Sequence, residues 1–232
     1  MSTTTSQAAY ESLRERILEG SIPPESTLRQ DALAQDLGIS RTPLRTALTE
    51  LARDGLVSYE ANRGYTVRAF DDHDIRTAFA VRAVLEGLAC RLVAERGAAQ
   101  GMLDTLRDCV RTGDKILAKG HLDPDELAPY RRMNVRFHDT IIAASANQWV
   151  TDFVARTHNV PLASDRVILW EEYAIIKRSH DDHHRILHAL AQGDARRAEN
   201  LMWEHVTYAG EVLIEHVRQL SASDRQPVTQ KR

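Results

Sequence analysis

Hydrophobic residues recur at helical spacing in three short stretches near the N-terminus. The pattern predicts helices over Tyr10–Gly20, Leu28–Leu37 and Arg41–Asp54. Ser40 stands where it can cap the third helix, and Pro43 falls in its first turn, where a missing N–H costs nothing. We therefore expect three short helices, each followed by a glycine.

Beyond the third helix the spacing of apolar residues changes. Leu56–Glu60 and Tyr65–Arg68 are short runs typical of strands, and Ala61–Gly64 between them contains the Asn and Gly of a hairpin turn. From Ile75 to about Val217 the spacing is helical again. The architecture is therefore expected to change near residue 70.

These elements predict a mainly α protein built from two parts. Residues 1–70 fit a winged helix-turn-helix, an α-helical unit with a β-hairpin, and residues 71–220 fit an all-α antiparallel helical bundle. Residues 1–7 and 221–232 are polar, so we expect frayed ends. No segment reaches the roughly 18 apolar residues that suggest a membrane span, and no signal peptide is apparent, which favours a cytoplasmic protein without membrane contact.

The third helix has the composition of a DNA recognition helix. Its first turns carry four donors, Arg41, Thr42, Arg45 and Thr46. Arginine binds guanine edges or phosphates with two parallel hydrogen bonds, and threonine bonds bases or contacts a thymine methyl. The opposite face is apolar and is expected to pack in the core, through Leu44, Ala47, Leu48 and Leu51.

Local charge agrees with DNA binding although the whole chain has a net charge of −3. Residues 41–69 contain five arginines and three acids, a net charge of +2. Arg63 and Gly64 lie at the expected hairpin tip, where a wing can contact the groove beside the recognition helix. With 43% apolar and 27% charged residues the chain has the composition of an ordinary globular protein. It contains only two cysteines, Cys90 and Cys109, too few for a disulfide scaffold.

Three motifs in this region resemble the GntR family of bacterial transcription regulators. They are Leu13–Gly20, Leu33–Arg45 with its Ser-Arg-Thr-Pro-Leu-Arg run, and Leu51–Val57. The resemblance implies that Arg41, Thr42, Arg45 and Gly64 contact DNA.

One position departs from the family pattern. Many GntR relatives carry Glu-Arg at the start of the second helix, where this chain has Gln30 and Asp31. An arginine contact expected from the family is therefore missing, and we expect Arg29 to substitute for it.

Ten histidines stand out in the chain, and helical geometry separates them. His138, with Asn134 one turn earlier, His183 and His205 each lie on the apolar face of a different predicted helix. Inward imidazoles are costly unless they are paired or bind a metal, so they indicate a divalent ion. A second strip, containing His180, His184 and His188, is expected to point more toward solvent.

The same residues resemble the helical effector domain called FCD, found in the FadR subgroup of the GntR family. The similarity spans roughly Ile75–Val217, about 145 residues, which favours the six-helix version over the seven-helix one. The resemblance implies that Asn134, His138, His183 and His205 hold a divalent metal, zinc first, with nickel or manganese as alternatives. Asn134 stands where Asp is commoner in the family, and its neutral oxygen is expected to weaken metal retention.

Arg82 and Glu86 lie one turn apart on the inner face of the first effector helix. Two interpretations stay open: a buried ion pair that holds the bundle together, or an effector site in which Arg82 binds a carboxylate whose other oxygens meet the metal. Arg136 adjoins the metal helix and is a lower-ranked effector contact.

These features predict a ligand-responsive DNA-binding regulator that acts as a repressor. We expect it to bind a near-palindromic operator of double-stranded DNA as a homodimer, and a small organic acid to control that binding. Two alternatives remain. In a direct metal sensor the ion itself is the signal. In a metal-dependent enzyme with a DNA-binding appendage, Glu86 would be the base; no nucleophile elbow or phosphate loop supports this.

Overall fold

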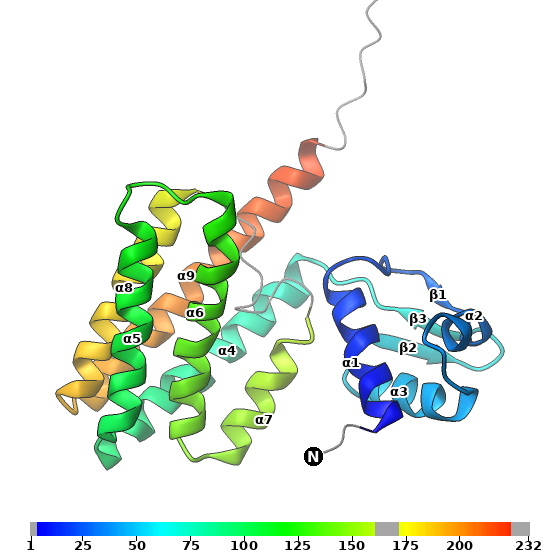
Figure 1. Ribbon diagram of the computed structural model, residues 1–232, viewed down its shortest axis with the longest axis horizontal. Helices are drawn as coiled ribbons and strands as arrows, with labels where there is room; N and C mark the ends of the chain where they lie inside the picture. The colour runs from blue at the N-terminus through cyan, green and yellow to red at the C-terminus, as the bar shows by residue number, and fades with distance from the viewer. Residues whose placement is uncertain (1–3, 161–171, 224–232) are drawn as a thin grey trace, which may run out of the picture. The chain divides into compact units, whose positions relative to one another are not determined.

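The computed structural model describes residues 4–160 and 172–223 and divides into two compact units. Residues 4–74 and 158–160 form the first, and residues 75–157 and 172–223 form the second. Both are rich in helix, and the described strands all belong to the first unit (Figure 1). The expectation of a mainly α protein, with a small winged helix-turn-helix before a helical bundle, is confirmed.

The first unit contains three helices and a small antiparallel sheet. The helices are α1 (Thr5–Leu18), α2 (Gln30–Asp36) and α3 (Arg41–Arg53). The strands are β1 (Thr27–Leu28), β2 (Val57–Glu60) and β3 (Gly64–Val67), in the order β1-β3-β2. Helix α3 packs against α1, α2 and β2, so its position is fixed from several sides.

The amphipathic pattern of α3 is confirmed. Leu44, Ala47, Leu48 and Leu51 are fully buried and join a core with residues of α1 and the sheet. The predicted hairpin also forms: Glu60 pairs with Gly64 across its tip. Gly64 has a φ of 83°, in the left-handed region that a glycine adopts without strain.

Three details of the first unit differ from the sequence-based prediction. Helix α1 begins at Thr5, not near Tyr10, because the Thr4 hydroxyl caps it by accepting the Gln7 N–H at 3.2 Å; residues 4–7 are therefore not frayed. Ser40 occupies the N-cap of α3 but its side chain makes no capping hydrogen bond. Strand β1 was not predicted, since two residues are too few to show an alternation.

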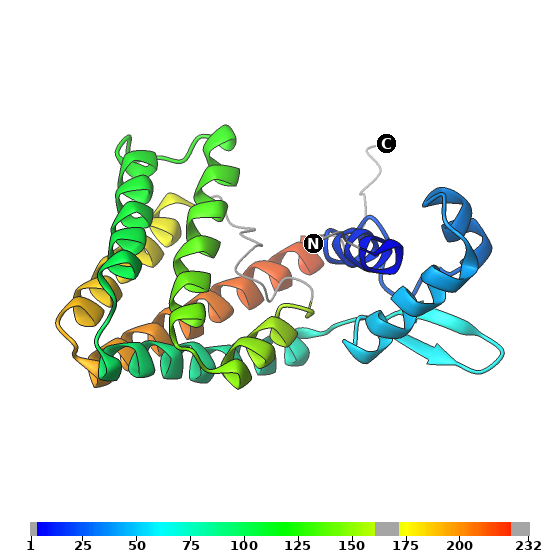
Figure 2. The ribbon, with the colours of Figure 1, turned by 60° about the horizontal axis from the view of Figure 1, so that its bottom comes forward.

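The second unit contains six helices within the described residues. They are α4 (Asp72–Arg96), α5 (Gln100–Leu117), α6 (Pro124–Ala144), α7 (Gln148–Thr157), α8 (Tyr173–Ala191) and α9 (Ala195–Ser223). Helix α5 packs against both α6 and α8, and α8 packs against α9 (Figure 2). Helix α9 continues to Ser223 and so includes the first three residues of the expected frayed tail, while residues 224–232 lie outside the described residues.

The bundle forms because each helix turns an apolar stripe inward. On α6 this stripe includes the fully buried Phe137 and Ile141, and on α8 it includes Ile176 and Ile186. Cys90 and Cys109 are buried free thiols. No described helix combines the length and apolar character that a membrane crossing requires. The inner faces of α6, α8 and α9 carry the histidines that make up the site described next.

Candidate DNA-binding face and buried histidine site

The start of α3 presents an exposed polar surface. Arg41, Thr42, Arg45 and Thr46 are all exposed, on the side of the helix opposite its buried leucines. Because the Ser40 side chain makes no capping hydrogen bond, it leaves the N–H groups of the first turn uncapped beside these donors. A helix end with free N–H groups, two guanidinium groups and two hydroxyls can bind phosphate and base edges.

Arg41 already has a partner within the protein. Its Nη2 lies 2.6 Å from Oδ1 of Asp31, and both side chains are more than two-thirds exposed. Arg29, the N-cap residue of α2, lines the same shallow pocket of about 590 Å³. The position where the sequence departs from the GntR pattern therefore places a carboxylate on an arginine of the predicted recognition helix, an interaction that the sequence alone did not reveal.

The hairpin tip exposes a further cation. The Arg63 side chain is 81% exposed, and its Nη1 contacts Glu60 Oε2 at 3.1 Å. At Gly64 a Cβ atom would meet nothing within 4 Å, so the positive φ, and not lack of space, is what favours glycine there. An exposed pair of this kind is weak and can exchange its carboxylate for a phosphate.

Three histidines from three helices meet inside the bundle. His138 of α6, His183 of α8 and His205 of α9 are each at most 3% exposed, and one ring nitrogen from each lies within 4.8 Å of the other two. The Nε2 atoms of His138 and His205 are 3.2 Å apart. The inward direction predicted for these three side chains is confirmed.

Glu86 of α4 links this cluster to a buried arginine. Its Oε2 lies 2.6 Å from His138 Nδ1, and its Oε1 lies 2.8 Å from Arg82 Nη2. The Arg82 and Glu86 side chains are only 3% and 1% exposed. If His138 donates its Nδ1–H to Glu86, the lone pair on Nε2 is directed toward the other two histidines, the arrangement found in metal-binding histidines.

The ring nitrogens of His183 fit a metal ligand. Both are buried and neither has a hydrogen-bond partner in the protein. Burial lowers the pKa of His183 well below its usual range, and the neighbouring His205 and His138 lower it further, so the ring is neutral. A neutral imidazole without a partner costs free energy unless something binds it, and a divalent ion would do so.

Two further polar groups border the cluster. Asp182 Oδ2 lies 3.9 Å from His205 Nδ1, too far for a direct hydrogen bond but close enough to orient the ring, and Asp182 also pairs with Arg185 at 2.7 Å. Asn134 is 7% exposed and lies one turn before His138 on the same buried face of α6. The carboxylate of Asp182 therefore lies near one of the imidazoles, and the Asn134 amide is buried one helical turn from another.

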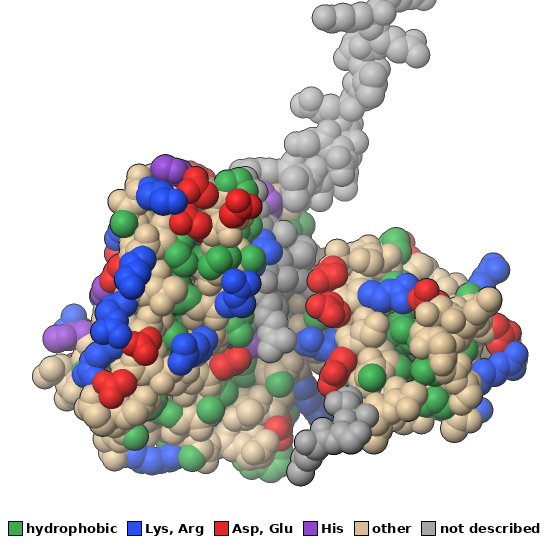
Figure 3. Space-filling model, viewed as in Figure 1, with side chains coloured by type: hydrophobic (Ala, Val, Ile, Leu, Met, Phe, Trp, Pro, Cys, Tyr) green, Lys and Arg blue, Asp and Glu red, His purple; other side chains and the backbone are tan. Residues whose placement is uncertain are grey.

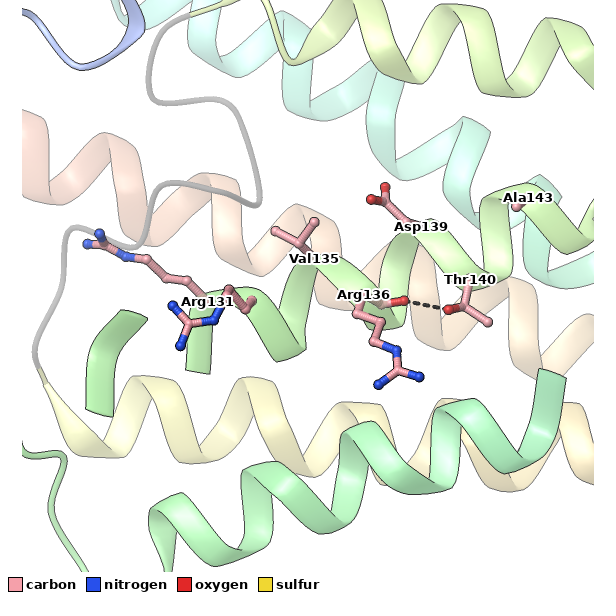
Figure 4. A pocket seen from close by; sticks show the side chains of 7 residues that line it. Arg131, Val135, Arg136, Asp139, Thr140 and Ala143 are labelled. Atoms are coloured by element: carbon pink, nitrogen blue, oxygen red, sulfur yellow. Dashed lines mark hydrogen bonds between the residues drawn. The ribbon is translucent and has the colours of Figure 1, made fainter. Parts of the chain in front are cut away.

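Arg136 lies apart from the Arg82–Glu86 pair. It is exposed and lines an open groove of about 660 Å³ on the outer side of α6, together with Arg131 and Arg132. In Figure 4 its side chain points toward α5. Basic side chains also gather over α5 and α6 on the face shown in Figure 3. The structure therefore brings Arg82 and Glu86, but not Arg136, to the histidines.

The second strip of histidines is partly buried, contrary to expectation. His184 and His188 are exposed, but His180 is only 1% exposed because its ring lies against α5. Helical spacing places a side chain on a face of its own helix, but it does not show where a neighbouring helix comes close.

Two family models match the chain, and together they span most of it. The model of the gntR family of bacterial regulatory proteins matches residues 5–67, and the FCD domain model matches residues 77–208. The chain belongs to the GntR family and carries an FCD domain. It is therefore a transcription regulator with a DNA-binding helix-turn-helix, and not an enzyme.

Relatives of this GntR regulator include two named repressors. The HTH-type transcriptional repressor GlaR of Escherichia coli (strain K12) is 26% identical over 218 residues, covering 88% of this chain and 93% of that protein. A probable D-xylose utilization operon transcriptional repressor of Paenarthrobacter nicotinovorans is 25% identical over 214 residues, covering 88% and 86%.

A solved structure shares the fold of this GntR regulator. The E. coli McbR/YncC structure has a TM-score of 0.71 over 93% of this chain and 100% of that chain, at 18% identity. At this identity the likeness establishes the fold alone.

Proposed function

We propose that this GntR regulator is a homodimeric repressor whose FCD domain binds a divalent metal and a small organic acid, and that the acid changes its affinity for a near-palindromic operator. The observation that carries the proposal is the buried meeting of His138, His183 and His205, with both ring nitrogens of His183 unpartnered. The names of the two relatives support repression.

DNA binding would use the exposed start of α3 and the hairpin tip. Arg41, Arg45, Thr42 and Thr46 would enter the major groove, while Arg63 and Gly64 would contact the backbone beside it and Arg29 would reach a phosphate from α2. Two copies would read half-sites about one helical turn apart. Bacterial DNA lies in the cytoplasm, which is where we place the protein.

The metal would be held by the three imidazoles and by the Asn134 side-chain oxygen. Three nitrogens and one oxygen suit zinc first, and also nickel or manganese. When bound, the ion supplies a positive charge to which a carboxylate effector can coordinate. Glu86 would orient His138 by accepting its Nδ1–H, and Asp182 would orient His205 through its charge, 3.9 Å from Nδ1.

The effector would be an organic acid, because a guanidinium binds carboxylates and that of Arg82 is connected to a metal ligand through Glu86. Arg82 contacts Glu86, and Glu86 contacts His138, so a carboxylate that pulls on Arg82 also disturbs a metal ligand. Arg136 would act at the outer groove of α6. Coupling to DNA requires that the acid bind the two states of the protein with different affinity.

Exposed apolar side chains support the homodimer. Helix α7 carries Trp149 and Phe153, 72% and 43% exposed, with ring centroids 6.0 Å apart. Helix α4 carries Val81 and Val84, 48% and 60% exposed and three residues apart. Exposed apolar groups of this size commonly mark a protein interface. Light scattering should give twice the mass of one chain, and Trp149→Ser should reduce it.

The test of the proposal combines metal analysis with DNA binding. The purified protein should contain about one equivalent of metal in that site, and the triple variant His138→Ala/His183→Ala/His205→Ala should lose it. Duplexes selected by the wild-type protein from a random pool then serve as the operator in gel-shift titrations. Full metal retention by the triple variant would overturn the site.

The same titrations separate the proposal from a direct metal sensor. A panel of small carboxylic acids added to the metal-loaded protein should change its operator affinity. If only a chelator changes the affinity and no acid does, the ion itself is the signal.

A further inference from the structure

A second cluster of metal-ligand groups joins α5 and α8 outside the three buried histidines. Oδ1 of Asp114 lies 3.0 Å from His180 Nε2 and 2.8 Å from His184 Nε2. The three ligand atoms lie within 4.8 Å of one another. His180 and His184 are four residues apart on α8, the spacing at which two imidazoles on one helix can reach one ion.

The structure of α5 makes room for this cluster at Gly113. A Cβ atom at this position would lie 2.1 Å from Cε1 and 2.8 Å from Nε2 of His180, far inside contact distance. The neighbouring residue on α5 is Asp114. A residue without a side chain in the middle of a helix therefore seats one imidazole, and the next residue offers it a carboxylate.

We propose that Asp114, His180 and His184 form a second divalent-metal site, open to solvent, that takes Zn²⁺ or another transition-metal ion that binds imidazole. A tetrahedral ion with bonds of about 2.0–2.1 Å places its ligand atoms roughly 3.3 Å apart. The two N···O separations are a few tenths of an ångström shorter, so a small outward movement of Asp114 admits an ion. Its side chain is 49% exposed and free to make that movement.

Exposure and charge fit an ion that keeps one or more waters. The His184 side chain is 45% exposed and His180 is 1% exposed, so protein closes one side of the cluster and solvent completes the other. Burial alone would raise the pKa of Asp114, but the hydrogen bonds from His184 and His180 hold it below its ordinary value. The carboxylate is therefore charged at neutral pH, as a ligand must be.

The second cluster shares no ligand with the first. The His180 and His183 ring centroids are 5.9 Å apart, and α8 presents His183 to one site and the pair His180/His184 to the other. The new site therefore uses none of the ligands of the proposed metal and effector function. A histidine–aspartate–histidine hydrogen-bond link without an ion is the competing explanation, and metal stoichiometry distinguishes the two.

The experiment compares zinc binding by the wild-type chain and by His184→Ala. Equilibrium dialysis against ZnCl₂ at neutral pH, followed by elemental analysis, should show one equivalent less zinc in His184→Ala. The matched control is His188→Ala, which removes another exposed histidine one turn further along α8 and should bind as much zinc as the wild type. Excess Mg²⁺ should displace nothing, because it prefers oxygen ligands.

A second variant tests the seat of His180. Gly113→Ala adds a methyl group that His180 cannot accommodate, so it should lose the same equivalent of zinc while circular dichroism shows helix content unchanged. Equal zinc binding by wild type, His184→Ala and Gly113→Ala would overturn the proposal. Loss of zinc only in the variant lacking His138, His183 and His205 would support the inner site and likewise reject this one.

Discussion

The two units of the protein place their functional side chains in opposite surroundings. The DNA-binding candidates of the first unit are exposed, Arg41 and Arg63 by 71% and 81%, over a core that is almost purely apolar. In the second unit Arg82, Glu86 and the metal-ligand candidates lie within the core itself and are at most 7% exposed, while Arg136 alone among the effector candidates is exposed. In the first unit the candidate functional side chains lie on the surface, outside the core. In the second unit polar candidate side chains take the place of apolar ones within the core.

This difference determines how substitutions should act. A surface arginine can be removed without leaving a cavity or an unpaired group, so its loss should change binding and leave stability alone. Removing a buried ionised or imidazole group leaves its former partner unpaired in a medium that cannot solvate it. Site and fold should therefore be separable by mutation at the exposed face of the first unit and inseparable at the buried site of the second.

The largest effect is expected at Glu86. Replacing it with alanine leaves the buried Arg82 guanidinium without this carboxylate and removes the acceptor of His138. Breaking one partner of a buried ion pair costs about 3–5 kcal/mol, so urea unfolding should show a loss of this size. The double variant Arg82→Met/Glu86→Leu is the control and should recover most of it. A Glu86→Ala protein as stable as wild type would show that the pair does not stabilise the bundle.

Arg45 should show the opposite behaviour. Arg45→Ala should weaken binding to a selected duplex by about 1–3 kcal/mol and relax specificity at one base pair, because a groove contact is lost. Its unfolding midpoint should stay at the wild-type value, since the side chain is exposed. Arg53→Ala, at the other end of α3, removes an equal charge and should bind nearly as well. Equal loss in both variants would mean that α3 contributes only general charge.

Tyr10 makes a half-buried polar contact in the first unit, and its substitution tests how much that contact contributes to stability. Its hydroxyl donates to Asp54 Oδ2 at 2.5 Å, and burial together with that carboxylate raises the pKa of Tyr10 to about 12. The folded state therefore favours the protonated phenol. Its stabilising contribution is complete below pH 10 and is lost as the pH rises toward 12.

Removing this hydroxyl should have a modest cost. Tyr10→Phe should lower the free energy of unfolding near pH 8 by about 1 kcal/mol and flatten its decline between pH 10 and 12. Chemical unfolding at several pH values measures both. An unchanged slope above pH 10 would show that another group titrates there.

The smallest effect is expected at Asp31, and it should be a gain. Asp31→Asn removes the carboxylate that competes with DNA for Arg41, so affinity should rise by at most about fivefold, the range of an exposed ion pair. Gel-shift titration at two salt concentrations measures it. Asp36→Asn, which frees Arg16 on the same unit, is the control. Weaker binding by Asp31→Asn would show that Asp31 positions Arg41 for DNA.

The sequence predicted the parts of the fold that depend on one helix at a time. The buried leucines of α3 and the inward turn of His138, His183 and His205 follow from a 3.6-residue period. Features that depend on how two helices pack against each other were not predicted. His180 is buried because Gly113 lies opposite it, and the two residues come from different helices.

The pairing of individual charges was equally beyond the sequence. Glu86 was expected beside Arg82, one turn away on the same helix. The contact of its second oxygen with His138 was not predicted, because His138 belongs to a helix distant in the chain. Asp31 was recognised as a departure from the family, while its contact with Arg41 depends on how α2 crosses α3. Periodicity reports which way a side chain points, and only packing decides what it meets.

The Arg41–Asp31 pair has a consequence for the way the protein finds its target among many competing sequences. Attraction to arbitrary DNA is almost wholly due to phosphate charge, and an internal carboxylate offsets part of it before any base is read. If Arg41 reads a base as proposed, a matched site would offer it two well-directed hydrogen bonds, which would compensate for giving up Asp31. The pair would thus shorten the time spent at wrong sites more than at the right one, and would exchange some tightness of binding for a faster search.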